Sequence, residues 1–336
     1  MSSLEDAISS EKEGDKFRKE SDLEQAWTRY SDALEIRTQT STLETPEGAS
    51  LLEKMGDVHR SLGELKEAFA LQTRAQSIRQ STQSMQTFEG AGLLVKMADV
   101  CRLRGDTVQS AQFCTEAQVI KLGASERHGE ELRQRSDLEQ AWRRFSDAQE
   151  IRTALGTLQS PEGARLLENM ADICRIRGDV DTALSLLTES QAVRIETATM
   201  DSEHGAALLQ KMANVCRLQG DLDKALSLCR DAQRRRLASN SMHGPEGANL
   251  LMEISLLLAT RGDIDEALKH RREAQKIRPT TGSMRLGADL LTKMGDLCVR
   301  REEVAEAMDL YTEAKFIRQT THTIQTSEGA ELVTKI

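Results

Sequence analysis

A glycine followed by alanine recurs along the chain just before helix-like sequence. These glycines are Gly48, Gly90, Gly163, Gly205, Gly247, Gly287 and Gly329. Most neighbours are 42 residues apart, one pair is 40 apart, and one pair is 73 apart, which is 42 plus a shorter unit of 31. A period of this size is typical of stacked supersecondary units that contact only their neighbours. We therefore expect a repeat array.

The composition agrees with an array of thin layers. Aromatic residues make up 3% and apolar residues 38% of the 336 residues, which is lean for one large core. The 54 acidic and 45 basic residues are interspersed, whereas a nucleic-acid partner favours a clustered basic face. No apolar run approaches the roughly 20 residues of a membrane span, and the acidic start does not resemble a signal peptide. We expect an intracellular, cytoplasmic protein without nucleic-acid partner or membrane insertion.

One unit shows how the period can fold. From Glu162 to Cys174, apolar residues recur at spacings of three and four, the pattern of an α-helix with one buried face. Gly178 can adopt the left-handed conformation that ends this helix, and Asp179 can cap the next, which runs from about residue 180 to 194. Because the turn is so short, the two helices are expected to pack antiparallel.

The same frame divides the chain into eight helical hairpins and a partial ninth. The predicted units cover residues 4–43, 44–85, 86–122, 123–158, 159–200, 201–242, 243–282 and 283–324, and the partial unit covers 325–336. The first and fourth units share a segment, because residues 21–27 return unchanged at 136–142. The fourth unit has no linker before it. Its first helix, near residues 125–135, carries few apolar residues, so we expect it to pack weakly.

The cysteines follow the repeat. Cys101, Cys174, Cys216 and Cys298 share one position of the unit, and Cys114 and Cys229 share another. This placement predicts small buried residues in a reducing compartment rather than disulfides or metal ligands. The histidines are scattered at His59, His128, His204, His243, His270 and His322, and no glycine-rich phosphate loop follows a strand. We therefore expect no enzyme activity, no metal and no cofactor.

Small residues inside the unit follow a family pattern. Gly56 is followed by Ala68 12 residues later and by Ala75 after 7 more, and nearly every unit repeats this spacing. The pattern resembles the tetratricopeptide repeat. The 42-residue period, with proline at Pro46 and Pro161, is similar to the longer variant of kinesin light chains and nephrocystin-like proteins. The resemblance implies a right-handed, all-α solenoid of about eight hairpins plus a terminal capping helix, with a concave channel that binds protein.

Charged residues of the first helices repeat as ladders beside the apolar face. They are Lys54, Asp57, Arg60, Lys96, Asp99, Arg102, Asp172, Arg175, Lys211, Asn214, Arg217, Lys293 and Asp296. In tetratricopeptide proteins these positions face the inner channel, so the resemblance implies a groove for a protein or peptide of acidic or mixed charge. The alternative is that Asp and Arg three residues apart pair on one helix, which adds roughly a few tenths of a kcal/mol and requires no ligand.

Two other motifs have structural explanations. Arg-Gly-Asp occurs at residues 104–106, 177–179 and 261–263, where the turn already requires Gly and Asp, so no adhesive role is expected. The run Arg234, Arg235 and Arg236 lies at a helix end, where cations interact favourably with the helix dipole. We interpret this run as a solvated face.

Two functions fit these features. The first is a non-catalytic scaffold or adaptor that holds a peptide or partner subunit in the concave groove, between Ser50 and Arg300. The alternative is a structural subunit permanently built into a large multiprotein assembly. In the partial unit, Leu332, Val333 and Ile336 are expected to cover the eighth unit as a lone cap, to continue into further residues, or to meet a partner.

Overall fold

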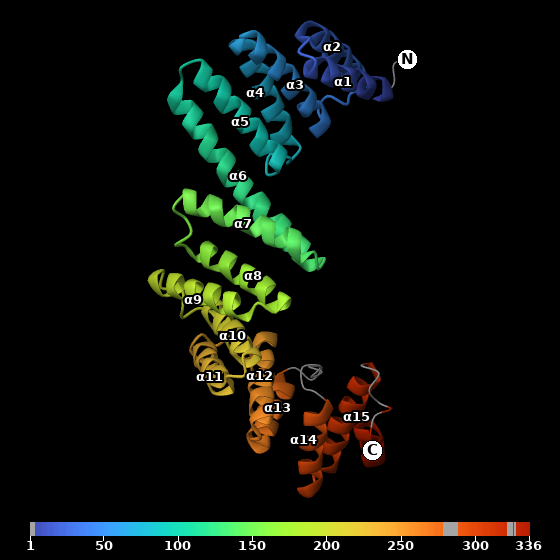
Figure 1. The fold of residues 1–336 in the computed structure, drawn as a ribbon, viewed down its shortest axis with the longest axis vertical. Coiled ribbons are helices and arrows are strands. Elements are labelled where there is room, and N and C mark those ends of the chain that lie inside the picture. The colour runs from blue at the N-terminus through green and yellow to red at the C-terminus, as the bar shows by residue number, and fades with distance from the viewer. Residues whose placement is uncertain (1–3, 278–287, 321–324, 326) are drawn as a thin grey trace. The chain divides into compact units, whose positions relative to one another are not determined.

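The computed structural model describes residues 4–277, 288–320, 325 and 327–336, and every regular element in these ranges is an α-helix. The helices pair into hairpins, and successive hairpins follow one another along the chain (Figure 1). This confirms the all-α prediction. The chain forms two compact units, Met1–Gly156 and Thr157–Ile336. No helix of the described part is long and apolar enough to cross a membrane.

Unit 1 consists of seven helices within its described residues. They are α1 (Leu4–Lys19), α2 (Leu23–Gln39), α3 (Pro46–Leu62), α4 (Leu65–Ser81), α5 (Phe88–Leu103), α6 (Thr107–Gln134) and α7 (Leu138–Ala154). The hairpin partners are α1 with α2 and α3 with α4, while α6 pairs with both α5 and α7. One helix therefore serves two hairpins.

Unit 2 consists of nine helices within its described residues. They are α8 (Pro161–Arg177), α9 (Val180–Glu196), α10 (Glu203–Leu218), α11 (Leu222–Ala238), α12 (Pro245–Arg261), α13 (Ile264–Ile277), α14 (Ala288–Arg300), α15 (Val304–Thr320) and α16 (Ser327–Lys335). The first eight pair in chain order into four hairpins, and α16 packs against α15. The core of each unit is thus a series of thin apolar seams between neighbouring helices.

The helix ends follow the predicted chemistry. Thr45 caps α3 by accepting a hydrogen bond from the Gly48 amide at 3.2 Å, and a proline follows the cap. Gly178 ends α8 with a φ of 82°, and Asp179 caps α9 by accepting from the Thr182 amide at 3.2 Å. The Arg-Gly-Asp segment at 177–179 is therefore a helix-to-helix turn.

The recurring glycine at the start of five first helices has a steric cause. At Gly48, a Cβ atom would collide with the backbone carbonyl of Leu43, and at Gly163 it would collide with that of Leu158. Gly90, Gly205 and Gly247 have the same relation to the residue five positions earlier. The linker thus crosses directly over the helix start, which only glycine permits.

Helix α6 departs from the regular hairpin. It continues for 28 residues through the predicted boundary between residues 122 and 123. Its second half packs on α7, where Gly129 lies against the ring of Phe145 and Leu132 is buried. The prediction that all cysteines are buried is wrong for Cys114 on this helix, which is exposed. Its counterpart Cys229 is buried on α11, which packs against α12 of the following hairpin, whereas α6 packs against α5 and α7.

The last helix is packed on one side. Leu332 is fully buried, while Val333 and Ile336 are 47% and 41% exposed. Lys335 binds Asp296 of α14 at 2.9 Å. Helix α16 therefore continues the pattern of a first helix stacked on the preceding hairpin.

Candidate functional site

The predicted lysine ladder connects neighbouring hairpins. Lys54 of α3 binds Asp15 of α1, with 2.8 Å between Nζ and Oδ2. Lys96 of α5 lies 3.2 Å from both Glu53 and Asp57 of α3. In unit 2, Lys211 of α10 is 2.9 Å from Asp172 and 3.8 Å from Glu168, both on α8. Each lysine thus joins its helix to the first helix of the preceding hairpin.

A buried arginine completes this network. Arg79 of α4 donates from Nε to Glu53 at 2.7 Å, and both side chains are almost fully buried. Arg194 and Glu168 repeat this contact at 2.7 Å in unit 2. The same pair, 26 residues apart, occurs as Arg37 with Glu11 and Arg152 with Glu126. One glutamate therefore forms an ion pair with an arginine of its own hairpin and can form a second ion pair with a lysine of the next hairpin.

Pairs within a helix occur as well. Arg102 binds Asp99 at 2.7 Å on α5, and Arg175 lies 3.8 Å from Asp172 on α8. Arg60, in contrast, makes no ion pair among the described residues, and its buried Nε has no hydrogen-bond partner there. The predicted pairing within one helix therefore occurs for Arg102 and Arg175 but not for Arg60.

The C-terminal part of the ladder contains one half-buried network. Asp296 of α14 accepts hydrogen bonds from the Tyr311 hydroxyl at 2.7 Å and from Lys335 at 2.9 Å. Burial alone would raise the pKa of Asp296, but these two hydrogen bonds outweigh it and lower the pKa. Burial and the bond to Asp296 raise the pKa of Tyr311 to about 12. Lys293, also predicted for the site, is exposed.

Five of the predicted residues meet at one cavity of unit 2. The cavity has a volume of about 310 Å³ and is lined by residues from α8, α10 and α12, namely Asp172, Arg175, Lys211, Asn214, Arg217, Glu253 and Leu256. Sequence reasoning missed Glu253 and Leu256. Glu253 stands 42 residues after Lys211, so the repeat frame itself could have placed it on the same face.

The charge pattern is reversed at the junction between α10 and α12. At the junction between α8 and α10, Glu168 and Asp172 of α8 face Lys211 of α10. At the next junction, Gln210 and Asn214 of α10 stand in place of the two acids, and Glu253 of α12 stands in place of the lysine. Glu253 is only 3% exposed. The two carboxylates and one cation of the neighbouring junction have thus become two amides and one carboxylate.

Arg217 lies beside this reversal. It lines the cavity but makes no ion pair with any residue that the structure describes. Its Nε is buried and has no hydrogen-bond partner in the described part of the chain. The residue three positions earlier is Asn214, whereas Arg102 and Arg175 have an aspartate there. The cavity therefore contains a guanidinium whose usual intrahelical partner is replaced by an amide.

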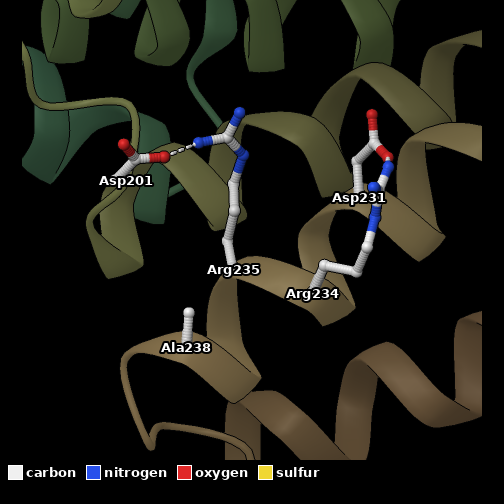
Figure 2. Close-up of a pocket in the computed structure, with 5 residues that line it drawn as sticks. All are labelled: Asp201, Asp231, Arg234, Arg235 and Ala238. Atoms are coloured by element: carbon white, nitrogen blue, oxygen red, sulfur yellow. Dashed lines mark hydrogen bonds and ion pairs between the residues drawn. The ribbon is translucent and has the colours of Figure 1, made fainter.

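A second cavity of about 270 Å³ lies beside α11 and is lined by Asp201, Asp231, Arg234, Arg235 and Ala238. Figure 2 shows Arg235 directed toward Asp201, and Arg234 pairs with Asp231. Both arginines of this cavity are thus neutralised. The predicted solvated face is wrong for Arg236, which is 3% exposed and donates to Gln210 at 3.2 Å. Its position is that of Arg79 and Arg194, so the repeat buries it.

One group of side chains has the spacing of metal ligands. Donor atoms of Cys298, Glu303 and Glu306 lie within 4.8 Å of one another. Arg272 of α13 forms ion pairs with both glutamates and supplies the positive charge there. Burial and the two carboxylates raise the pKa of Cys298 to about 11, which disfavours a thiolate ligand. The group fits an ion-paired hairpin junction better than a metal centre.

The fold and this site define an α-helical hairpin repeat protein. Residues 203–280 match the sequence profile of the tetratricopeptide repeat family. The matched residues include the hairpins α10–α11 and α12–α13, so this part of the chain consists of tetratricopeptide repeats. No curated protein matches the chain.

Several solved structures are similar to part of this chain. YrrB, described as a TPR protein with an unusual peptide-binding site, is 15% identical, with 63% of this chain and 91% of that chain covered and a TM-score of 0.40. BtubC from P. vanneervenii is 15% identical over 70% of this chain and 91% of that one, with a TM-score of 0.46. The nearly identical TPR-like repeats of a Podosopora anserina putative kinesin light chain are 14% identical over 70% and 97%, with a TM-score of 0.37.

Proposed function

We propose that this tetratricopeptide repeat protein is a non-catalytic scaffold or adaptor that binds a peptide, or an extended segment of a partner subunit, on its first helices. The observation that supports this role is the cavity between α8, α10 and α12, where five ladder residues meet. Its walls carry both signs of charge and one apolar side chain, Leu256. A protein segment of mixed or acidic charge matches such a lining.

The ladder residues contribute unequally to the proposed surface. Lys54 and Lys96 are engaged by carboxylates of the preceding hairpin, so a ligand would have to displace existing pairs. Arg217 lines the cavity without an ion pair among the described residues, and Arg175 lines it at 3.8 Å from Asp172. We therefore place the main contact on unit 2.

A displayed peptide library tests the proposal. The whole chain is immobilised and used to select from random 12-residue peptides, and enriched peptides are then measured by calorimetry. Arg175→Glu reverses one charge of the cavity and is expected to weaken binding at least about tenfold, while Arg143→Glu, at an exposed position of α7, is the matched control. Enrichment of nothing, or equal binding by both variants, would show that the cavity is not a peptide site.

Sedimentation of the purified chain separates the scaffold from the alternative function. A scaffold is expected to remain monomeric and disperse without partners. A permanent assembly subunit is expected to self-associate or aggregate, because its exposed apolar residues, such as Val108 and Val119 on α6, would normally be covered. Monomeric behaviour together with selected peptides supports the scaffold.

A further inference from the structure

We infer that the cavity of unit 2 recognises the carboxylate of an acidic side chain, aspartate or glutamate, through Arg217. The inference rests on the proposed function and makes it specific, because it assigns the recognition of a negatively charged ligand side chain to one hairpin of the array. Asn214 is the residue that makes this possible, because α5 and α8 have at this position an aspartate that pairs with the arginine.

The first step of the argument is the state of the equivalent arginines. On α5, Asp99 pairs with Arg102 at 2.7 Å, and on α8, Asp172 lies 3.8 Å from Arg175. On α10, the side-chain amide of Asn214 donates to the Gln210 backbone carbonyl at 3.2 Å. An amide has no charge with which to compensate a guanidinium. The exchange of Asp for Asn therefore leaves the positive charge of Arg217 for another partner.

The second step is where that charge lies. Arg217 is half-buried and lines the cavity, and its buried Nε has no hydrogen-bond partner in the described residues. A buried donor without a partner destabilises the protein, so a ligand that accepts a hydrogen bond from it recovers this loss. Arg60 also has an unpartnered Nε, but α3 contributes no ladder residue to the cavity of unit 2.

The third step decides between anions. A guanidinium presents parallel donors that match the two oxygens of a carboxylate. Asp172 and Glu253 also line the cavity, and Lys211 is already paired with Asp172. A doubly charged phosphate would face both acidic residues, whereas a single carboxylate adds less repulsion. Leu256 provides apolar surface for the methylene groups of an acidic side chain or its neighbour.

The test changes the partner of Arg217 and leaves every cation in place. Asn214→Asp restores the aspartate that α5 and α8 have at this position, so Arg217 is expected to pair within α10. Peptides selected on the wild-type chain are expected to share an Asp or Glu, and replacing it by Asn or Gln should weaken binding about tenfold or more. Asn214→Asp should weaken the acidic peptide by a similar factor and remove the difference between the two peptides.

Asn214→Ala is the matched control, because it removes the amide without adding charge. It should retain the preference for the acidic peptide, and unchanged circular dichroism melting of all variants verifies folding. If Asn214→Asp keeps the full preference, or selected peptides lack a common acidic residue, the assignment of Arg217 is wrong. Those results leave the peptide site itself intact, whereas failure to select any peptide overturns the proposed function.

Discussion

At the scale of single residues, the interior of a hairpin depends on matched sizes across the two helices. A Cβ atom on Gly14 would lie 2.6 Å from the ring of Tyr30, one on Gly129 would lie 2.8 Å from Phe145, and one on Gly295 would lie 2.5 Å from Tyr311. Distances this short do not occur between unstrained atoms. The glycine of the first helix and the aromatic residue of the second are therefore one packing unit.

Gly129→Ala tests this packing unit. Phe145 is fully buried, so its ring has no free volume to move into, and we expect a loss of about 1–3 kcal/mol in the free energy of unfolding. Gly92→Ala is the matched control, because nothing lies within 4 Å of its added Cβ. Since alanine is the better helix former, this control should gain roughly 0.5–1 kcal/mol. Chemical denaturation of both variants measures the difference, and equal effects would contradict the argument.

Gln72 occupies the aromatic position of the second hairpin. Its side chain is fully buried and lies against Gly56, but neither of its amide atoms has a hydrogen-bond partner within the described residues. Oδ1 of Asp57 is also buried and unpartnered, whereas the Tyr30 hydroxyl donates to Asp15 at 2.7 Å in the first hairpin. In the variant Gln72→Tyr, the ring should pack against Gly56 and the hydroxyl should donate a hydrogen bond to Asp57.

We expect Gln72→Tyr to raise the free energy of unfolding by about 1 kcal/mol, since it satisfies a buried acceptor and fills the seam. Denaturant unfolding checks the gain. Gln72→Phe fills the same space without the hydroxyl, and it should gain less. A Tyr variant no more stable than the Phe variant would show that the hydroxyl does not reach Asp57.

At the scale of helices, the hairpins are held together by a repeated ionic connection. Glu168 of α8 binds the buried Arg194 of α9 at 2.7 Å and lies 3.8 Å from Lys211 of α10. The glutamate is 5% exposed and Arg194 is 3% exposed. Removing the carboxylate from such a buried pair leaves an uncompensated charge, which costs more than the pair itself contributes.

Glu168→Ala should therefore reduce the free energy of unfolding by about 3–5 kcal/mol. Glu168→Gln should cost clearly less, because the natural Gln210 accepts from Arg236 at 3.2 Å in the following hairpin. Thermal or denaturant unfolding of the two variants gives the comparison. Equal losses would mean that the amide of Gln210 does not substitute for a carboxylate at this position.

The connection between α1 and α3 predicts a pH dependence. Burial would raise the pKa of Asp15, but hydrogen bonds from Lys54 and Tyr30 outweigh it and lower the pKa. A carboxyl with a lowered folded-state pKa contributes stability above its unfolded-state pKa of about 3.9 and loses it as the pH falls through the folded-state value. Asp15→Asn should thus be less stable than wild type at neutral pH.

The difference between wild type and Asp15→Asn should stay constant above about pH 5 and shrink as the solution becomes more acidic. Urea unfolding at a series of pH values measures it. Glu24→Gln removes an exposed charge near the same end of the chain and serves as the control. A difference that is independent of pH would rule out the ionised form of Asp15 as the cause.

The ends of the helices were predictable from sequence, but the contacts between hairpins were not. Thr45 and Asp179 cap helices through local chemistry that a sequence displays directly. Lys96, however, binds residues 43 and 39 positions earlier, and only the stacking register of two hairpins brings them together. The repeated Glu and Arg 26 residues apart, as in Glu53 and Arg79, were the available signal for the buried pairs. The cavity was not predictable either, because its lining comes from three stacked helices, and only their stacking places Glu253 beside the predicted residues.

At the scale of the whole molecule, the chain consists of two compact units with the boundary after Gly156. This boundary differs from the shortened repeat near residue 123, which the sequence suggested as the irregular point. The reason is α6, whose single helix spans two hairpins and keeps them in one unit. A missing linker in the sequence therefore marks a fused helix.

Fragments test the two units. Residues 1–156 and 157–336 should each be helical and unfold cooperatively, because each retains complete hairpins and repeat units depend mainly on their neighbours. A fragment that starts at residue 123 divides α6, so it lacks the first half of the helix and the capping contact of Asp106 with Gln109. Its fourth hairpin, α6 with α7, should fray.

Amide hydrogen exchange of the fragments locates the effect. In residues 123–336, exchange in α7 should be faster than in the 1–156 fragment, while α10 and α11 should exchange at the same rate as in residues 157–336. A helix that starts within α6 also lacks a side-chain N-cap, which typically costs about 1 kcal/mol. Equal protection of α7 in both fragments would show that the continuity of α6 contributes nothing to the fourth hairpin.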